Sequence, residues 1–455
     1  MADLQVKQHV SGRGRTGRRR EKRRSKIDCQ RNISQEKKYV ELQQWLNANG
    51  AGGYPLRPTY FHDTGRGLMA TKSMKPGDVI VSIPSNLLIT SQVVLRSELK
   101  DVLKTFPVKL TARLLLCAFV IYERQKGSSS FWAPYIGSLP DAFSTPSYFT
   151  SEELQLLPAP LRQRATEQNS LLCDGFSKLT KFFEFGQECH FLSDFSFDFD
   201  DFKWAWSAVN TRTLYYKVEE AGSHRLVDPS ERDVYVLAPF LDLLNHSSTA
   251  EVAGSFNSIK QCYEIQTTTP YNKFDQVFIH YGPHDNETLL LEYGFVEPTN
   301  PHSVVAITKE DVIKFSSEVM DAWVSETGSV LPKRFERIEA KGIWDISCSL
   351  NGPSWHLTVS LNILCMGQEQ YGRGEWVGLL GGEEPSQECL ARSRRAVQNI
   401  LCNYLAKGVT SSQELLSIKS DSYHHYMTVQ LMQEKKFILE ECLKQVQQFE
   451  PQEQT

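Results

Sequence analysis

The spacing of apolar residues along the sequence differs between long blocks of the chain, and the order of these blocks restricts the folds available to it. Residues 57–90 and 234–282 hold short apolar runs that alternate and end at turn residues, which is typical of β-strands. Residues 91–215 and the region after 305 instead repeat apolar residues every three or four positions, which is typical of helices. Strands that are grouped in this way favour an α+β fold with a second, mostly α-helical domain.

The expected domain boundaries fall where the period changes. Folded structure is expected from about residue 35, where Val40, Trp45 and Leu46 give a helix one apolar side before Gly50 ends it. The expected parts are a disordered basic tail at 1–34, an N-terminal helix at 35–56, a β-rich domain at 57–282 with a helical insertion at about 91–233, a connection at 283–304, a helical domain at 305–447 and a tail at 448–455. A length of 455 residues agrees with two or three domains of roughly 150 residues each.

Local patterns within the helical regions give more specific expectations. Thr150 followed by Glu153 predicts a capping box at the start of a helix. Residues 354–366 fit either a strand or a helix, because their apolar residues satisfy both periods. The apolar positions between Leu390 and Leu405 predict a helix that ends at Gly408.

Composition excludes several classes of protein. An apolar content of 40% and a charged content of 23% are those of an ordinary soluble globular protein. The longest apolar run, Leu114 to Tyr122, is much shorter than the ~20 residues of a membrane span, and no signal-peptide segment is present. The ten cysteines are scattered, without a C-x-x-C pair or zinc-ligand spacing. We therefore expect reduced thiols, no metal, no membrane association and a location inside the cell.

The charge is unevenly distributed, because residues 11–26 hold nine Lys or Arg and one Glu. This segment has no apolar residues to bury, so we expect it to be disordered. A nuclear-import signal, non-specific contact with nucleic acid, or a solvated leader without either role would each explain it. Any nucleic-acid contact is expected only through this tail, and the expected location is the cytoplasm and the nucleus.

Several common catalytic motifs are missing from the sequence. There is no G-x-S-x-G elbow, P-loop, H-E-x-x-H or kinase motif set, and the Gly65-x-Gly67 element precedes strand-like sequence instead of a helix. The apolar run at 241–244 stops abruptly at Asn245-His246. Taken alone, that pair indicates a turn with a surface histidine.

The joint order of five phrases points to a family. They are GRGLM, WAW-x-x-VNTR, LAP-x-LDLLNHS, YGPHDN and LEYGFV, in chain order. The set resembles the SET-domain protein methyltransferases, in the branch typified by the Rubisco large-subunit lysine methyltransferase. The resemblance covers nearly the whole chain from about residue 35, and the order of the phrases is more specific than any one of them. It identifies 57–282 as a SET domain, 283–304 as a post-SET-like connection and 305–447 as a substrate-binding domain.

The resemblance implies S-adenosyl-L-methionine as the methyl donor. Thr64, Gly65 and Arg66 would supply backbone contacts to it, because a glycine-rich turn lets a ligand approach the main chain. A plain turn would contain the same residues. Asn245 and His246 would hold the amino-acid and adenine portions of the donor.

The resemblance also implies roles for two charged residues. Arg212 matches a family arginine near the cofactor, where its guanidinium would bind the donor's carboxylate or form a structural ion pair. Asp242 would serve either the cofactor or the order of its own segment. This chain has Asn-Thr-Arg where many relatives have Ser-Arg, so the substrate contacts of the side chain before the arginine are in doubt.

The aromatic residues of the set have different expected roles. Tyr281 is the expected catalytic and donor-proximal residue, because its hydroxyl can orient a neutral lysine amine toward the methyl group. Tyr293 and Phe295 would pack on the adenine or the lysine stem, or would be core aromatics. By strand alternation, His280 points away from Tyr281 and receives no role.

The implied function is an S-adenosylmethionine-dependent protein-lysine N-methyltransferase acting on histone or non-histone proteins. Two alternatives remain: a catalytically weak SET-fold module that recruits partners, and a methyltransferase whose acceptor is histidine.

Overall fold

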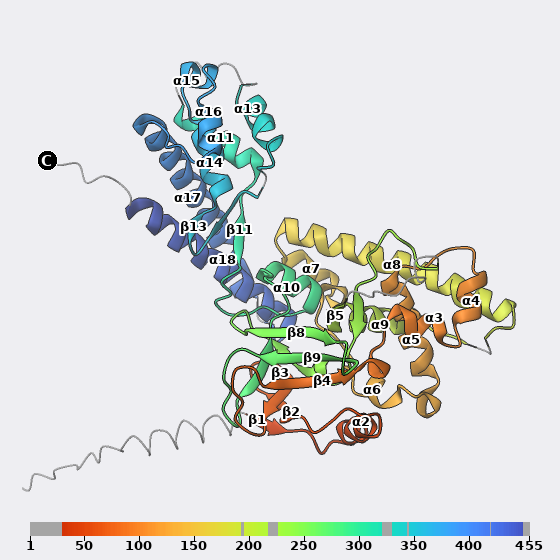
Figure 1. The fold of residues 1–455 in the computed structure, drawn as a ribbon. Helices are drawn as coiled ribbons and strands as arrows, with labels where there is room; N and C mark the ends of the chain where they lie inside the picture. The colour runs from red at the N-terminus through yellow and green to blue at the C-terminus, as the bar shows by residue number, and fades with distance from the viewer. Residues whose placement is uncertain are drawn as a thin grey trace, which may run out of the picture. The chain divides into compact units, whose positions relative to one another are not determined.

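The computed structural model describes six stretches of the chain (Figure 1), at residues 30–192, 195–216, 226–320, 330–343, 345–418 and 420–448. The basic segment 11–26 and the tail at 449–455 lie outside them. The chain divides into two compact units, Met1–Phe143 with Ser170–Tyr281, and Ser144–Asn169 with Gly282–Thr455. Within the six stretches, no helix has both the length and the apolar content needed to cross a membrane.

The first unit contains a five-stranded sheet that joins segments far apart in the sequence. Its strand order is β1-β2-β3-β10-β7. The strands are β1 Gln30–Asn32, β2 Leu56–Phe61, β3 Gly65–Ala70, β10 Gln276–Ile279 and β7 Asn245–His246. Strand β10 runs antiparallel to β3 and parallel to β7, and the parallel register pairs Phe278 with Asn245 and Ile279 with His246. This pairing brings the predicted glycine turn, the Asn-His pair and the Tyr281 strand to one sheet.

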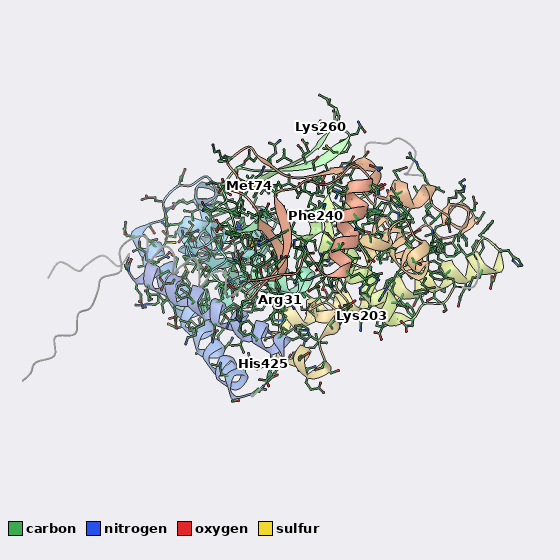
Figure 2. The ribbon with its side chains drawn as sticks, turned by 90° about the horizontal axis from the view of Figure 1, so that it is seen from below. Arg31, Met74, Lys203, Phe240, Lys260 and His425 are labelled. Carbon is green, nitrogen blue, oxygen red and sulfur yellow. The ribbon has the colours of Figure 1, made fainter. Side chains whose placement is uncertain are left out.

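Two smaller sheets complete the strands of this unit. Strands β4 Val79–Pro84, β9 Cys262–Thr267 and β8 Val252–Asn257 pair in that order, and β5 Thr213–Tyr215 pairs with β6 Tyr235–Leu237. Figure 2 shows Lys260 at the outer tip of the β8–β9 hairpin.

The helices between β4 and β5 make up the predicted insertion. Helix α5 is the most apolar of them. Thr111 caps its N-terminus by accepting a hydrogen bond from the Leu114 N–H, and residues Leu114 to Ile121 are all buried. The helices of the insertion are α3 Ser91–Arg96, α4 Lys100–Thr105, α5 Ala112–Gln125, α6 Ala133–Ile136, α7 Ser151–Leu156, α8 Ala159–Glu188 and α9 Phe199–Arg212. Helix α2 Lys37–Ala48 lies earlier, between β1 and β2. Residues Ser144–Asn169, inside the expected insertion, belong to the second unit.

The second unit is mostly helical and has its own apolar core. Figure 1 shows its two longest helices, α17 and α18, in contact along the C-terminal part of the chain. Its helices are α10 Asn286–Tyr293, α11 Lys309–Val319, α13 Val330–Glu339, α14 Trp355–Leu364, α15 Gln368–Gly372, α16 Trp376–Leu380, α17 Gln387–Ser417 and α18 Tyr423–Gln448. A small antiparallel sheet is formed by β11 Val304–Ala306, β12 Ser347–Ser349 and β13 Gly352–Pro353.

The structure decides several local expectations. The capping box of Thr150 and Glu153 is confirmed at the start of α7. The ambiguous segment 354–366 is a helix, α14, with Ser354 as its N-cap. The cysteines of the described residues are free thiols, as expected.

Two expected boundaries are wrong. Residues 30–32 were expected in the disordered tail, but they pair with β2 as strand β1, since main-chain pairing along a sheet edge needs no apolar side chain. The helix expected to end at Gly408 continues to Ser417. A single glycine weakens a helix by only ~1 kcal/mol, which packing against α18 can offset.

We expect the Gly408→Ala variant to be more stable than the wild type by roughly 0.5–1 kcal/mol, because alanine loses less backbone freedom in a helix. A Cβ at this position would meet nothing within 4 Å. The measurement is urea unfolding at equilibrium. The matched control is Gly294→Ala, which should destabilise, because Gly294 has a φ of 76° and its Cβ would lie 2.5 Å from the backbone carbon of Ser144. A destabilised Gly408→Ala variant would contradict the expectation.

Candidate active site

The glycine turn is the first part of the site. Residues 62–64 form the turn between β2 and β3, and Gly65 starts β3 with a φ of 70°. Of the expected glycine-rich turn at Thr64, Gly65 and Arg66, only Thr64 lies in the turn, and the other two residues begin strand β3. Gly67 lies against the site, because a Cβ on it would be 2.8 Å from both Asn245 Nδ2 and Gln276 Nε2. Only glycine allows these side chains to approach the strand so closely.

Asn245 joins this turn to strand β7. Its Nδ2 group donates hydrogen bonds to the carbonyl oxygens of Thr64, at 3.3 Å, and Arg66, at 2.9 Å. The two segments are separated by 179 positions between Arg66 and Asn245. Because the amide is planar, fixing Nδ2 on the turn directs Oδ1 the other way as a hydrogen-bond acceptor. The predicted turn residues and Asn245 therefore lie together.

His246 and Tyr281 form the second part of the site. The Tyr281 N–H donates to His246 Nδ1 at 3.0 Å, and the two rings lie 5.2 Å apart. The Tyr281 hydroxyl donates to the Leu244 carbonyl oxygen at 2.8 Å. The ring of His280 lies 5.4 Å from that of His246. His280 and Tyr281 follow strand β10, which ends at Ile279, so their side chains need not alternate between opposite faces of the sheet. The rings of both residues therefore lie near the ring of His246.

Arg212 and Asp242 form the third part. Arg212 Nη1 donates to the Asp242 carbonyl oxygen at 2.7 Å and lies 3.5 Å from Asp242 Oδ2. The hydroxyl of Tyr135 donates to the same Oδ2 at 3.0 Å. Burial raises the pKa of Asp242, although Arg212, Tyr135 and Arg66 act in the opposite direction. The ion pair that was one of two expectations for Arg212 is present.

Four residues of the site had no predicted role. Gln276 exchanges hydrogen bonds with the Thr64 hydroxyl, with Gln276 Nε2 lying 2.8 Å from Thr64 Oγ1. Tyr135 bonds Asp242, and Tyr39 together with the Ser138 carbonyl holds the Arg66 guanidinium. No motif marked these residues, because they meet the site through tertiary contacts across 27 to 212 positions of sequence.

Tyr293 and Phe295 lie in the second unit, where their rings are 6.3 Å apart. The Tyr293 ring is 5.9 Å from that of His284, and burial raises the pKa of its hydroxyl. Phe295 packs against a small core that includes Leu290, Leu291 and neighbours from α7 and α18. Their expected packing on the adenine or the lysine stem stays a prediction.

Since burial raises the pKa of Asp242, we expect this residue to make the stability of the folded protein fall with rising pH. Below the unfolded pKa of about 3.9, both states hold the proton and no penalty arises. As the pH rises through the folded-state pKa, the unfolded chain releases its proton first and unfolding is favoured. Urea unfolding from about pH 4 to about pH 7 should show wild-type stability declining relative to the Asp242→Asn variant. A difference that does not change with pH would contradict this.

The arrangement matches a known class of protein. A SET domain model matches residues 65–282. The chain is 35% identical to SET domain-containing protein 4 of Mus musculus over 374 residues, which is 82% of each chain. It belongs to the SET-domain methyltransferase family.

More distant matches broaden this picture. The chain is 26% identical to the ribosomal lysine N-methyltransferase set11 of Schizosaccharomyces pombe, covering 79% of this chain and 86% of that one. It is 24% identical to the actin-histidine N-methyltransferase of Xenopus tropicalis, covering 89% and 69%. A crystal structure of the SET domain of LSMT bound to lysine and AdoHcy shares the fold, with a TM-score of 0.58, 19% identity and coverage of 91% and 92%. The expected family and the α+β class with a helical C-terminal region are confirmed.

Proposed function

We propose that this chain is an S-adenosylmethionine-dependent protein-lysine N-methyltransferase with Tyr281 as its catalytic residue. One observation carries the proposal. The phenol of Tyr281 is held by the Leu244 carbonyl oxygen and lies against His246, directly beside the bridge from Asn245 to the glycine turn. A hydroxyl acceptor is thereby fixed next to the residues that suit the methyl donor.

The residues present fit the donor's amino-acid portion. Its ammonium needs oxygen acceptors, and Asn245 Oδ1 and the backbone at 64–66 offer them. A Cβ on Gly65 would meet nothing within 4 Å, so the main chain there is accessible. Arg212 Nε is buried without a hydrogen-bond partner among the described residues, and a carboxylate would satisfy it. When bound, the donor supplies an electrophilic methyl group on a sulfonium.

The side chain of Tyr281 would position the acceptor nitrogen. Its hydroxyl donates to the Leu244 carbonyl oxygen, and a phenol oxygen can accept a hydrogen bond while it donates one, so an amine N–H could bond to it. Such a bond aligns the nitrogen lone pair for an in-line displacement, where positioning supplies much of the rate gain.

A lysine acceptor must also be neutral when it reacts. With an ordinary pKa of ~10.4, holding it neutral at pH 7 costs roughly 4–5 kcal/mol. Desolvation in the site disfavours the ammonium form and so lowers this cost. His246 is buried and accepts a hydrogen bond from the Tyr281 N–H, so its ring helps to exclude water from this part of the site.

The main alternative within the same class is a histidine acceptor. The similarity to the actin-histidine N-methyltransferase favours it, while the similarity to the ribosomal lysine N-methyltransferase favours lysine at slightly higher identity. Matched peptides that differ only in Lys or His at the acceptor position separate the two. We propose histone and non-histone proteins as substrates, bound by the helical second unit, in the cytoplasm and nucleus. Any contact with nucleic acid is assigned to the basic tail alone.

The test is methyl transfer from radiolabelled donor to a cell extract, followed by mass spectrometry of the labelled sites. Label on lysine side chains, lost in the Tyr281→Phe variant, is the expected result. Label on histidine would replace lysine as the acceptor. No label with folded wild-type protein would favour the other class, a SET-fold module that recruits partners without catalysis.

A further inference from the structure

The backbone turn before Asn245 is strained and must be held by its surroundings. Phe240, labelled in Figure 2, has a φ of 70° and a ψ of −41°, which is rare for a bulky residue, and it is almost fully buried. A 3-10 turn, η5 Leu241–Leu243, follows at once. Such a conformation costs energy and persists only where neighbouring contacts fix it.

The ring of Phe240 stacks on that of Tyr54, with centroids 5.3 Å apart, and three further elements donate hydrogen bonds to the residues that follow it. Arg212, at the end of α9, donates to the carbonyl oxygen of Asp242 at 2.7 Å. Tyr135, from α6, donates to the carboxylate of Asp242 at 3.0 Å. Tyr281, after β10, donates to the carbonyl oxygen of Leu244 at 2.8 Å. Tyr135 and Tyr281 thus donate hydrogen bonds to the same turn at positions two residues apart, Asp242 and Leu244.

The position of Tyr135 is well determined. Its side chain is fully buried, and a buried hydroxyl needs a hydrogen-bond partner. Its partner is a carboxylate that is only 2% exposed, so the bond is charge-assisted and shielded from water. The groups that face the Asp242 carboxylate are Tyr135 from α6, Arg212 from α9 and the charge of Arg66 from β3.

We propose that Tyr135 is a positioning residue: through Asp242 it fixes the turn that presents the Leu244 carbonyl oxygen to the hydroxyl of Tyr281. The inference rests on the proposed methyl-transfer function. It assigns Tyr135 no contact with substrate or donor. The turn is held in its working geometry only while the Asp242 carboxylate is ionised, since a protonated carboxyl would lose its attraction to Arg212 and Arg66.

The test is the pH dependence of single-turnover methyl transfer in the Tyr135→Phe variant. Phenylalanine keeps the buried ring and removes the one donor. The ionised Asp242 then loses a charge-assisted hydrogen bond, so the step that Asp242 adds to the acid limb of the rate profile, beside the step set by deprotonation of the acceptor amine, should move to higher pH by about one unit. The KM for the donor should change less than the rate does. A profile that overlays the wild type would overturn the proposal.

A matched control separates this effect from a general loss of stability. Tyr122 also donates to a carboxylate, Glu98 Oε2 at 2.5 Å, in the same unit. Tyr122→Phe therefore removes a similar bond without touching Asp242, and its acid limb should overlay the wild type. An equal shift in this variant would also overturn the proposal.

If Tyr135→Phe does not fold, the Asp242→Asn variant provides the measurement. Its amide does not titrate, so the step assigned to Asp242 should disappear from the acid limb, while the step set by deprotonation of the acceptor amine remains. An acid limb unchanged from the wild type would count against the proposal. These outcomes differ from failure of the function itself, in which folded wild-type protein transfers no methyl group at any pH.

Discussion

The Tyr281→Phe variant is expected to lose about 100- to 1,000-fold in the rate of methyl transfer, the range seen when one preorganised polar group is removed from an active site. The ring contact with His246 is kept, while the bond to the Leu244 carbonyl and the acceptor oxygen are lost. Donor affinity should change little, because the Asn245 bridge to the turn is untouched. Single-turnover kinetics and calorimetry of donor binding measure the two effects.

The control is Tyr271→Phe. Tyr271 also donates its hydroxyl to a backbone carbonyl oxygen, that of Phe278 in β10, at 3.3 Å. Removing it takes away the same kind of bond within the same unit, together with the bond that the hydroxyl accepts from the Phe278 N–H, and most of the activity should remain. Wild-type turnover in Tyr281→Phe, or an equal loss in both variants, would remove Tyr281 from the catalytic role.

The Gly67→Ala variant is expected to weaken donor binding by about tenfold or more, a change of ~1.4 kcal/mol. The added Cβ would lie 2.8 Å from Asn245 Nδ2 and Gln276 Nε2, so both side chains must move. The bridge from Asn245 to the Arg66 carbonyl, at 2.9 Å, is then broken. The donor's dissociation constant is the quantity to measure.

A double-mutant cycle with Asn245→Ala tests the cause of this loss. If Gly67 acts through Asn245, the two substitutions together should weaken binding no more than the stronger one alone. Additive effects would show that the Cβ disturbs the site by another route. Gly408→Ala serves as the control for a harmless glycine substitution and should leave donor affinity unchanged.

Much of the fold was predictable because it depends on local patterns. The strands within 57–90, the helices within 91–215 and the capping box at Thr150 each follow from residues within a few positions of one another, and the structure shows strands, helices and the capping box there. The end of α17 was not predictable, because the helix meets α18 again beyond Gly408, where Leu415 is buried and its carbonyl oxygen lies 3.1 Å from His425 Nε2. Strand β1 was missed because its residues, Gln-Arg-Asn, contain no apolar position, while its pairing with β2 runs along the backbone.

The residues of the candidate site were likewise predictable only in part. Asn245, His246 and Tyr281 were found from motif order, and the structure brings them together with the turn at Thr64. Gln276 was missed, since one glutamine at a strand start carries no pattern of its own. Tyr135 was missed for a similar reason, as it lies 107 positions from Asp242.

The sequence by itself determined the order of strands and helices, the family and the residue types that the site uses. These are properties of periodicity and of short motifs, which are written in neighbouring residues. Only the tertiary structure decided which partner each polar group takes: Asn245 on the turn, Arg212 and Tyr135 on Asp242, and Tyr281 on Leu244. Such choices depend on burial and on contacts between distant segments, because a buried polar group must find a partner wherever the fold places one.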